Sequence, residues 1–105
     1  MRNIYFAILL FFTVIAHAQK TPEVELAVGD SLINSYQFER AREVLYSVVR
    51  EFPDNVDALY KLAYCHNRSG NYFDSRIYLK NASAIDSSRA DIIILLAQTY
   101  SQMGL

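Results

Sequence analysis

Residue types recur along this chain at positions 34 apart. The pair Val28-Gly29 is followed at that spacing by Leu62-Ala63 and then by Leu96-Ala97, and Leu45 is followed by Leu79. Large residues recur as large and small residues as small, without an insertion. A fixed period in this range predicts a stack of repeated units, because one unit alone cannot bury its apolar face and needs a neighbour to cover it.

Each unit is predicted to be helical. Phe38, Ala41, Leu45, Val48 and Phe52 follow one another at steps of three and four, which places all five on one face of a helix. Turn and capping signals divide the chain from Thr21 onward into five such segments. These signals are Thr21-Pro22 before the first helix, Pro53-Asp54-Asn55 before the third, Ser69-Gly70-Asn71 before the fourth, and the capping-box pattern Ser88 to Asp91 before a fifth that ends near Gly104. The result is an all-α fold, with the third helix expected over about residues 56–68 and the fourth over about residues 72–85.

The recurring residues resemble the tetratricopeptide repeat family, whose units carry a Leu-Gly pair and a Tyr on a first helix, an Ala on a second, and a closing Pro. The matching positions are Glu25, Val28-Gly29, Leu32, Ala41, Leu45 and Pro53 in the first unit, Leu59, Leu62-Ala63, His66, Ser75, Leu79 and Ser87 in the second, and Ile93, Leu96-Ala97 and Tyr100 in the third. Glu25, His66 and Ser87 depart from the family's pattern. The resemblance covers about residues 22–105, as units 22–55, 56–89 and an incomplete 90–105. It implies antiparallel helical hairpins stacked as a right-handed α-solenoid with a concave inner face.

Residues 1–18 differ in character from the rest of the chain. Arg2 supplies a positive start, a nearly unbroken apolar run extends from Ile4 to Ile15, and Ala16-His17-Ala18 follows. This order is typical of a secretory signal peptide, with cleavage expected after Ala18. The apolar run is shorter than the roughly 20 residues that span a membrane. We therefore expect an exported protein, periplasmic or secreted, with a folded domain over residues 19–105 and no stable membrane span after cleavage; retention of the segment as an anchor is the alternative.

The composition argues against several kinds of function. The formal net charge is −1 and the arginines are interleaved with acidic residues, whereas a nucleic-acid binder would carry a basic patch. We find no nucleophile–base constellation, no phosphate-binding glycine loop and no metal-ligand spacing, so we expect neither an enzyme nor a cofactor- or metal-binding protein. Cys65 is the one cysteine and cannot form an internal disulfide. We interpret Cys65 as an inert, semi-buried thiol and His66 as a packing residue at a tyrosine position.

In the tetratricopeptide repeat family, the first helix of each hairpin lines the concave face, where a protein or peptide partner binds. The resemblance therefore implies a partner-binding surface in this chain. The residues at the matching inward-facing positions are Asp30, Ile33 and Asn34 in the first unit, Tyr60, Tyr64, Asn67 and Arg68 in the second, and Gln98 and Ser101 in the third. The four residues of the second unit share one side of a helix and could hold a peptide by stacking and hydrogen bonds. We expect an exported scaffold module that mediates protein–protein interaction.

The last predicted helix is unusually apolar. Ile92 to Leu96 form an aliphatic run that goes nearly round the helix. Exposing three such side chains would forgo roughly 5–9 kcal/mol of burial. We therefore expect residues 92–103 to be covered by a second copy of the chain, by a partner protein or by further repeats. The alternative to a self-contained module is a truncated N-terminal sensor or scaffold region of a longer envelope or signalling protein.

Overall fold

The computed structural model describes residues 21–105, and the predicted signal peptide over residues 1–18 lies outside them. The described residues form five α-helices and no strand. The helices are α2 (Pro22–Asn34), α3 (Phe38–Glu51), α4 (Val56–Arg68), α5 (Tyr72–Ile85) and α6 (Ala90–Gln102). Each helix packs against the next one along the chain, and α4 also packs against α2 and α6. The predicted all-α fold is confirmed.

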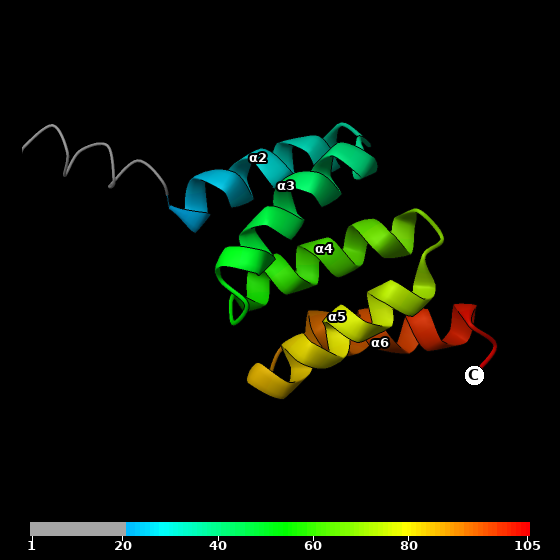
Figure 1. Ribbon diagram of the computed structural model, residues 1–105. Helices are drawn as coiled ribbons and strands as arrows, with labels where there is room; N and C mark the ends of the chain where they lie inside the picture. Colours follow the sequence, from blue (N-terminus) through cyan, green and yellow to red (C-terminus); the bar gives the residue numbers. More distant parts are fainter. Residues whose placement is uncertain (1–20) are drawn as a thin grey trace, which may run out of the picture.

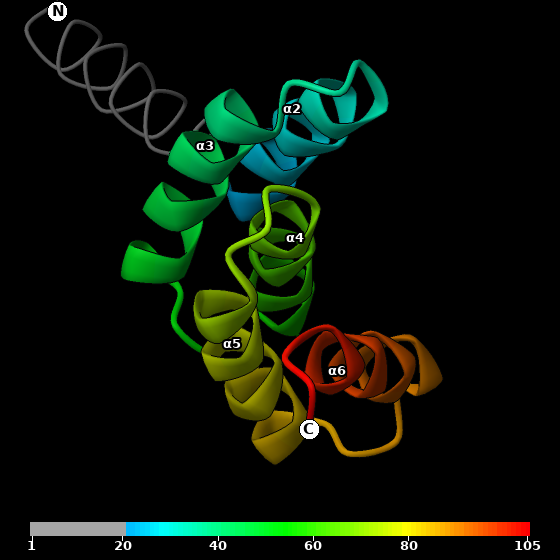
Figure 2. The same ribbon diagram turned by 90° about the vertical axis from the view of Figure 1, so that its right-hand side faces the viewer.

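The helices lie in two layers. Figure 2 shows α2, α4 and α6 along one side of the molecule and α3 and α5 along the other. Helices α2 and α3 form one hairpin, α4 and α5 form the next, and α6 follows as a single helix (Figure 1). The predicted solenoid of stacked helical hairpins is confirmed, and α4 lies at the centre of the α2–α4–α6 layer.

Local signals set most of the helix ends. Pro22 occupies the first turn of α2. The side chain of Asn55 accepts a hydrogen bond from the backbone N–H of Ala58 at 3.0 Å and so caps α4, as predicted. Gly70 has a φ of 80°, a left-handed conformation that glycine adopts without strain in the turn between α4 and α5.

The predicted capping box before α6 is wrong. Arg89 occupies the N-cap position, and no side chain caps the helix there. The hydroxyl of Ser88 donates instead to Asp86 Oδ1 at 2.6 Å, while Asp91 accepts hydrogen bonds from the guanidinium of Arg89. Charge-assisted bonds are about twice as strong as neutral ones, so the pairing of Asp91 with Arg89 displaces the local motif.

Two adjoining clusters of buried side chains form the core. One includes Leu45 of α3 and Leu62 of α4, and the other includes Leu79 of α5 with residues of α4 and α6. These three leucines have no exposed surface. Ala41 and Val48 are likewise fully buried, which confirms the predicted apolar face of α3 at its central positions.

Small residues allow the helices to approach closely, as predicted. Ala41, Ala63 and Ser75 are fully buried. Gly29 is buried on α2, and a Cβ atom added there would lie 2.8 Å from Leu45 Cδ2. Ala97 holds the equivalent position of α6 but is exposed, because no described helix packs over it.

Replacing Gly29 with alanine is expected to destabilise the fold, although alanine is the better helix former by about 1 kcal/mol. Leu45 is fully buried, and the added methyl group would lie 2.8 Å from its Cδ2 and 3.1 Å from its Cγ, so it overpacks the contact between α2 and α3 at a typical cost of about 1–3 kcal/mol. Urea unfolding followed by circular dichroism measures the change. In a Leu45→Ala background the Gly29→Ala replacement should cost less, because the side chain that it crowds has been shortened. A Gly29→Ala chain that is more stable than the parent would contradict this packing.

Candidate partner-binding surface

Tyr60 and Tyr64 lie about one turn apart on α4 and line a cavity of about 250 Å³. Asp30 and Ile33 of α2 form the opposite wall, and Lys61 completes the lining. The cavity therefore lies within the α2–α4–α6 layer and brings together four residues predicted for partner binding. Lys61 lies 2.8 Å, at Nζ, from Asp30 Oδ1. No local pattern in the sequence singles out Lys61, because its partner is on another helix.

Arg89, at the start of α6, joins carboxylates on two helices. Its guanidinium contacts Asp57 of α4 and lies 2.7 Å from Asp91 Oδ2, and its carbon lies 5.6 Å from the centre of the Tyr60 ring. The hydrogen bonds from Arg89 hold the pKa of Asp91 below its usual value. Burial raises the pKa of Tyr60, and so do Asp91 and Tyr64, whereas Arg89 lowers it. The Tyr60 phenol therefore stays neutral and can donate a hydrogen bond to a ligand.

The other predicted residues do not line this cavity. The amide of Asn67 donates to Thr99 Oγ1 at 2.9 Å and thereby links α4 to α6. The guanidinium carbon of Arg68 lies 5.5 Å from the centre of the Phe38 ring, so it contacts α3. Both side chains thus make contacts within the fold. The remaining predicted residues, all exposed on α2 and α6, are Asn34, Gln98 and Ser101.

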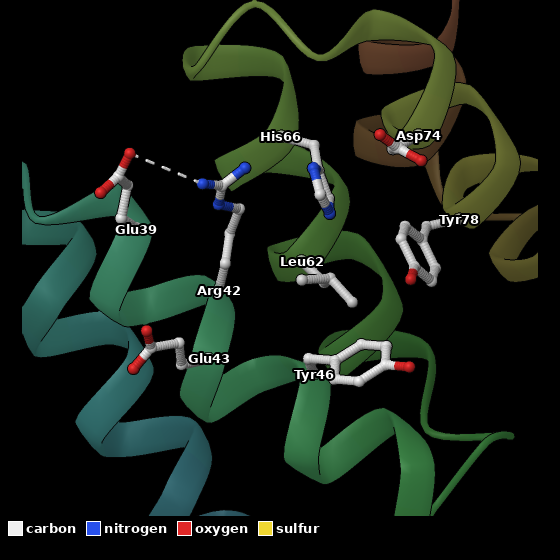
Figure 3. A pocket seen from close by; sticks show the side chains of 8 residues that line it. All are labelled: Glu39, Arg42, Glu43, Tyr46, Leu62, His66, Asp74 and Tyr78. Carbon is white, nitrogen blue, oxygen red and sulfur yellow. Dashed lines mark ion pairs between the residues drawn. The ribbon is translucent and has the colours of Figure 1, made fainter.

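A larger cavity, of about 480 Å³, lies between α3 and α5 (Figure 3). Leu62 and His66 of α4 lie between the two walls. No Cα atom of α3 lies within 8 Å of a Cα atom of α5, which leaves room for a groove between them. Its walls are Glu39, Arg42, Glu43 and Tyr46 of α3 and Asp74 and Tyr78 of α5. No local signal in the sequence identifies this cavity, because it forms only when three helices pack together.

His66 packs against Tyr78, in keeping with the packing role predicted for it. Their ring centres are 5.6 Å apart and their planes differ by 16°. Burial lowers the pKa of His66; Asp74 opposes this shift and Arg42 reinforces it. The preceding residue, Cys65, is fully buried rather than semi-buried, and burial raises the pKa of its thiol to about 11. The thiol therefore stays protonated and unreactive at neutral pH.

The lowered pKa of His66 predicts a loss of stability in mild acid. Its folded-state pKa lies below the reference value of 6.5, so below that pH the unfolded chain binds more protons than the folded chain, and the free energy of unfolding falls. A His66→Phe chain should therefore lose less stability than the parent between about pH 7 and about pH 5. Urea unfolding at several pH values tests this. Equal losses in the two chains would show that the imidazole is as easily protonated folded as unfolded.

Two further features limit the chemistry of the described chain. Within residues 21–105, no group of three or more His, Cys, Asp or Glu side chains is arranged to hold a metal ion. Over the same residues, no helix is both long enough and apolar enough to cross a membrane.

Residues 32–76 match a family model described as tetratricopeptide repeat. The matched stretch runs from the end of α2 through α3 and α4 into α5, and it contains Tyr60 and Tyr64. This stretch is therefore similar to tetratricopeptide repeats, and the five helices packed in sequence are consistent with such repeats. A search among curated proteins found no match. The tetratricopeptide repeat assignment supports a protein-interaction scaffold as the general role of the chain.

Proposed function

We propose that this chain is an exported scaffold that binds a partner polypeptide on its α2–α4–α6 layer. The observation that carries the proposal is the pair Tyr60 and Tyr64, half-buried beside a cavity between two helices of that layer. Tyrosine is enriched among the residues that dominate protein–protein binding energy, because its ring offers a large rigid surface and its hydroxyl a hydrogen bond.

The charges near this cavity favour an uncharged partner segment. Lys61 is paired with Asp30, and Arg89 is paired with Asp57 and Asp91. A charged ligand would have to compete with these ion pairs, whereas an apolar side chain could enter the cavity beside the tyrosine rings and leave them intact. We infer that the partner supplies an extended segment with apolar, uncharged side chains. Its affinity should then change by less than about threefold between low and high salt, because few charges are gained or lost.

Export is supported by the pattern of the first eighteen residues, a positive start, a short apolar run and an Ala16-His17-Ala18 end. We propose that the domain acts in the periplasm or outside the cell. The test is to express the chain fused to a detectable tag, once with residues 1–18 and once without them. The tagged chain is then looked for in the cytoplasmic and the exported fractions. Retention of both forms in the cytoplasm would contradict it.

The location of the binding surface can be tested by nuclear magnetic resonance. A peptide selected from a random library on the 105-residue chain is titrated into the isotope-labelled chain. We expect the amide shifts to change at Ile33, Tyr60 and Tyr64, which line the cavity of the α2–α4–α6 layer. Changes confined to α3 and α5 would place binding on the opposite layer and contradict the proposal.

We also propose that the outer face of α6 is covered by a second copy of the chain. Ile93 and Ile94 are 52% and 56% exposed, whereas Ile92 and Leu95 are buried in the core. The residue of α4 that corresponds to Ile93 is Leu59, which is 2% exposed because it packs in the cluster with residues of α5 and α6. The support for the proposal is therefore an apolar face that α4 buries and α6 does not.

Replacing Ile93 with asparagine is expected to weaken this self-association. Light scattering after size exclusion should give a mass above that of one chain for residues 19–105, and a lower mass for the Ile93→Asn variant. Ile85→Asn is the matched control, because Ile85 is 47% exposed on the neighbouring helix. If the parent domain stays monomeric at high concentration, a second copy does not cover α6 and the proposal is contradicted.

A further inference from the structure

We propose that the groove between α3 and α5 is a second binding site, which takes an arginine or lysine side chain of a partner polypeptide. It lies on the layer opposite to the Tyr60–Tyr64 cavity and shares no lining residue with it. The proposal therefore does not depend on the function proposed above.

The shape of the groove suits a long side chain. Its walls come from two helices whose Cα atoms stay more than 8 Å apart, and its cavity of about 480 Å³ is the larger of the two described above. Leu62 is fully buried beneath the groove, and the stacked rings of His66 and Tyr78, both half-buried, provide an apolar surface. His66 lies between Arg42 and Asp74 (Figure 3). An aliphatic stem could pack against this surface while its charged end reaches the walls.

The charges of the lining favour a cation. The lining carries three carboxylates, those of Glu39, Glu43 and Asp74, and one guanidinium, that of Arg42, which lies 3.8 Å from Glu39. Among the described residues, Glu43 on one wall and Asp74 on the other form no ion pair. The net charge of the lining is therefore negative, and a guanidinium or ammonium group that enters beside Asp74 could pair with its carboxylate, whereas an anion would be repelled.

The aromatic walls favour the same ligand. Tyr46 is 49% exposed on α3, and Tyr78 lines the opposite wall. Arg50 of this chain already lies over the Tyr46 ring, 6.0 Å from its centre, so the ring faces a cation within the fold. Phenol rings beside carboxylates attract cationic side chains through both the ring face and the charge. Shape, charge and aromatic lining thus point to one class of ligand.

The test is a titration of the isotope-labelled 105-residue chain with acetyl-tetraarginine amide. We expect saturable changes of the amide shifts at Tyr46, His66 and Tyr78, and no such changes with acetyl-tetraglutamate amide. The Glu43→Gln/Asp74→Asn variant should bind the arginine peptide about fivefold to tenfold more weakly, since each exposed ion pair contributes up to about 1 kcal/mol. Tyr46→Leu, which removes an exposed ring, should also weaken binding.

The matched control is Glu51→Gln/Asp54→Asn, which removes the same charge from two exposed residues outside the groove. This variant should keep its affinity within about twofold of the parent. Equal weakening in both double variants would mean that net charge alone attracts the peptide and would overturn the proposal. Shifts spread evenly over the surface, or confined to the Tyr60–Tyr64 cavity, would overturn it as well.

Discussion

Replacing Leu79 with alanine should lower the free energy of unfolding by about 2–5 kcal/mol. Leu79 is fully buried on α5 and packs in the cluster that joins α4, α5 and α6. The truncation removes apolar contacts and leaves a cavity that neighbouring helices can close only in part. A small domain is stable by about 5–15 kcal/mol in all, so this single change removes a large share.

The matched control for this prediction is Ile77→Ala on the same helix. Ile77 is 40% exposed, so its truncation should cost less than about 1 kcal/mol. Urea unfolding followed by circular dichroism compares the two variants with the parent. If both replacements cost the same, the α4–α5–α6 cluster is not the core that the structure describes.

Replacing Tyr60 and Tyr64 together with alanine should weaken binding of a selected peptide by about a hundredfold. Aromatic residues at the centre of an interface each contribute about 2 kcal/mol or more, and two adjacent ones are not fully additive. The fold should survive, because both side chains are only half-buried and Leu59 and Ala63, the buried residues beside them, stay in place. Circular dichroism verifies the helix content before binding is measured.

The helices could be predicted from the sequence because their signals are local. Apolar spacing, Asn55 and Gly70 set boundaries that the structure reproduces, and the period identifies the buried small residues such as Ala41 and Ala63. The capping box at Ser88 failed for the opposite reason. Asp91 pairs with Arg89 instead, and Arg89 is also held by Asp57 on α4, a contact between distant residues that leaves no trace in a local pattern.

The candidate surface could be predicted only in part. The family pattern identifies the inward-facing positions, and four of them meet in one cavity. It does not show that Asn67 is engaged by Thr99, that Arg68 lies over Phe38, or that Lys61 neutralises Asp30. Each of these contacts depends on how neighbouring helices are placed. The groove between α3 and α5 is hidden from the sequence for the same reason.

The central claim is that the α2–α4–α6 layer binds a polypeptide. The direct measurement is the affinity of one library-selected, fluorescently labelled peptide for three chains, by fluorescence anisotropy. These are the parent, Tyr60→Ala/Tyr64→Ala, and the control Phe73→Ala/Ile77→Ala, which removes two exposed apolar side chains from α5 in the opposite layer. We predict a loss of about a hundredfold for the Tyr60 and Tyr64 variant and a change of less than about threefold for the control. Equal affinity of the parent and the Tyr60 and Tyr64 variant would contradict the account.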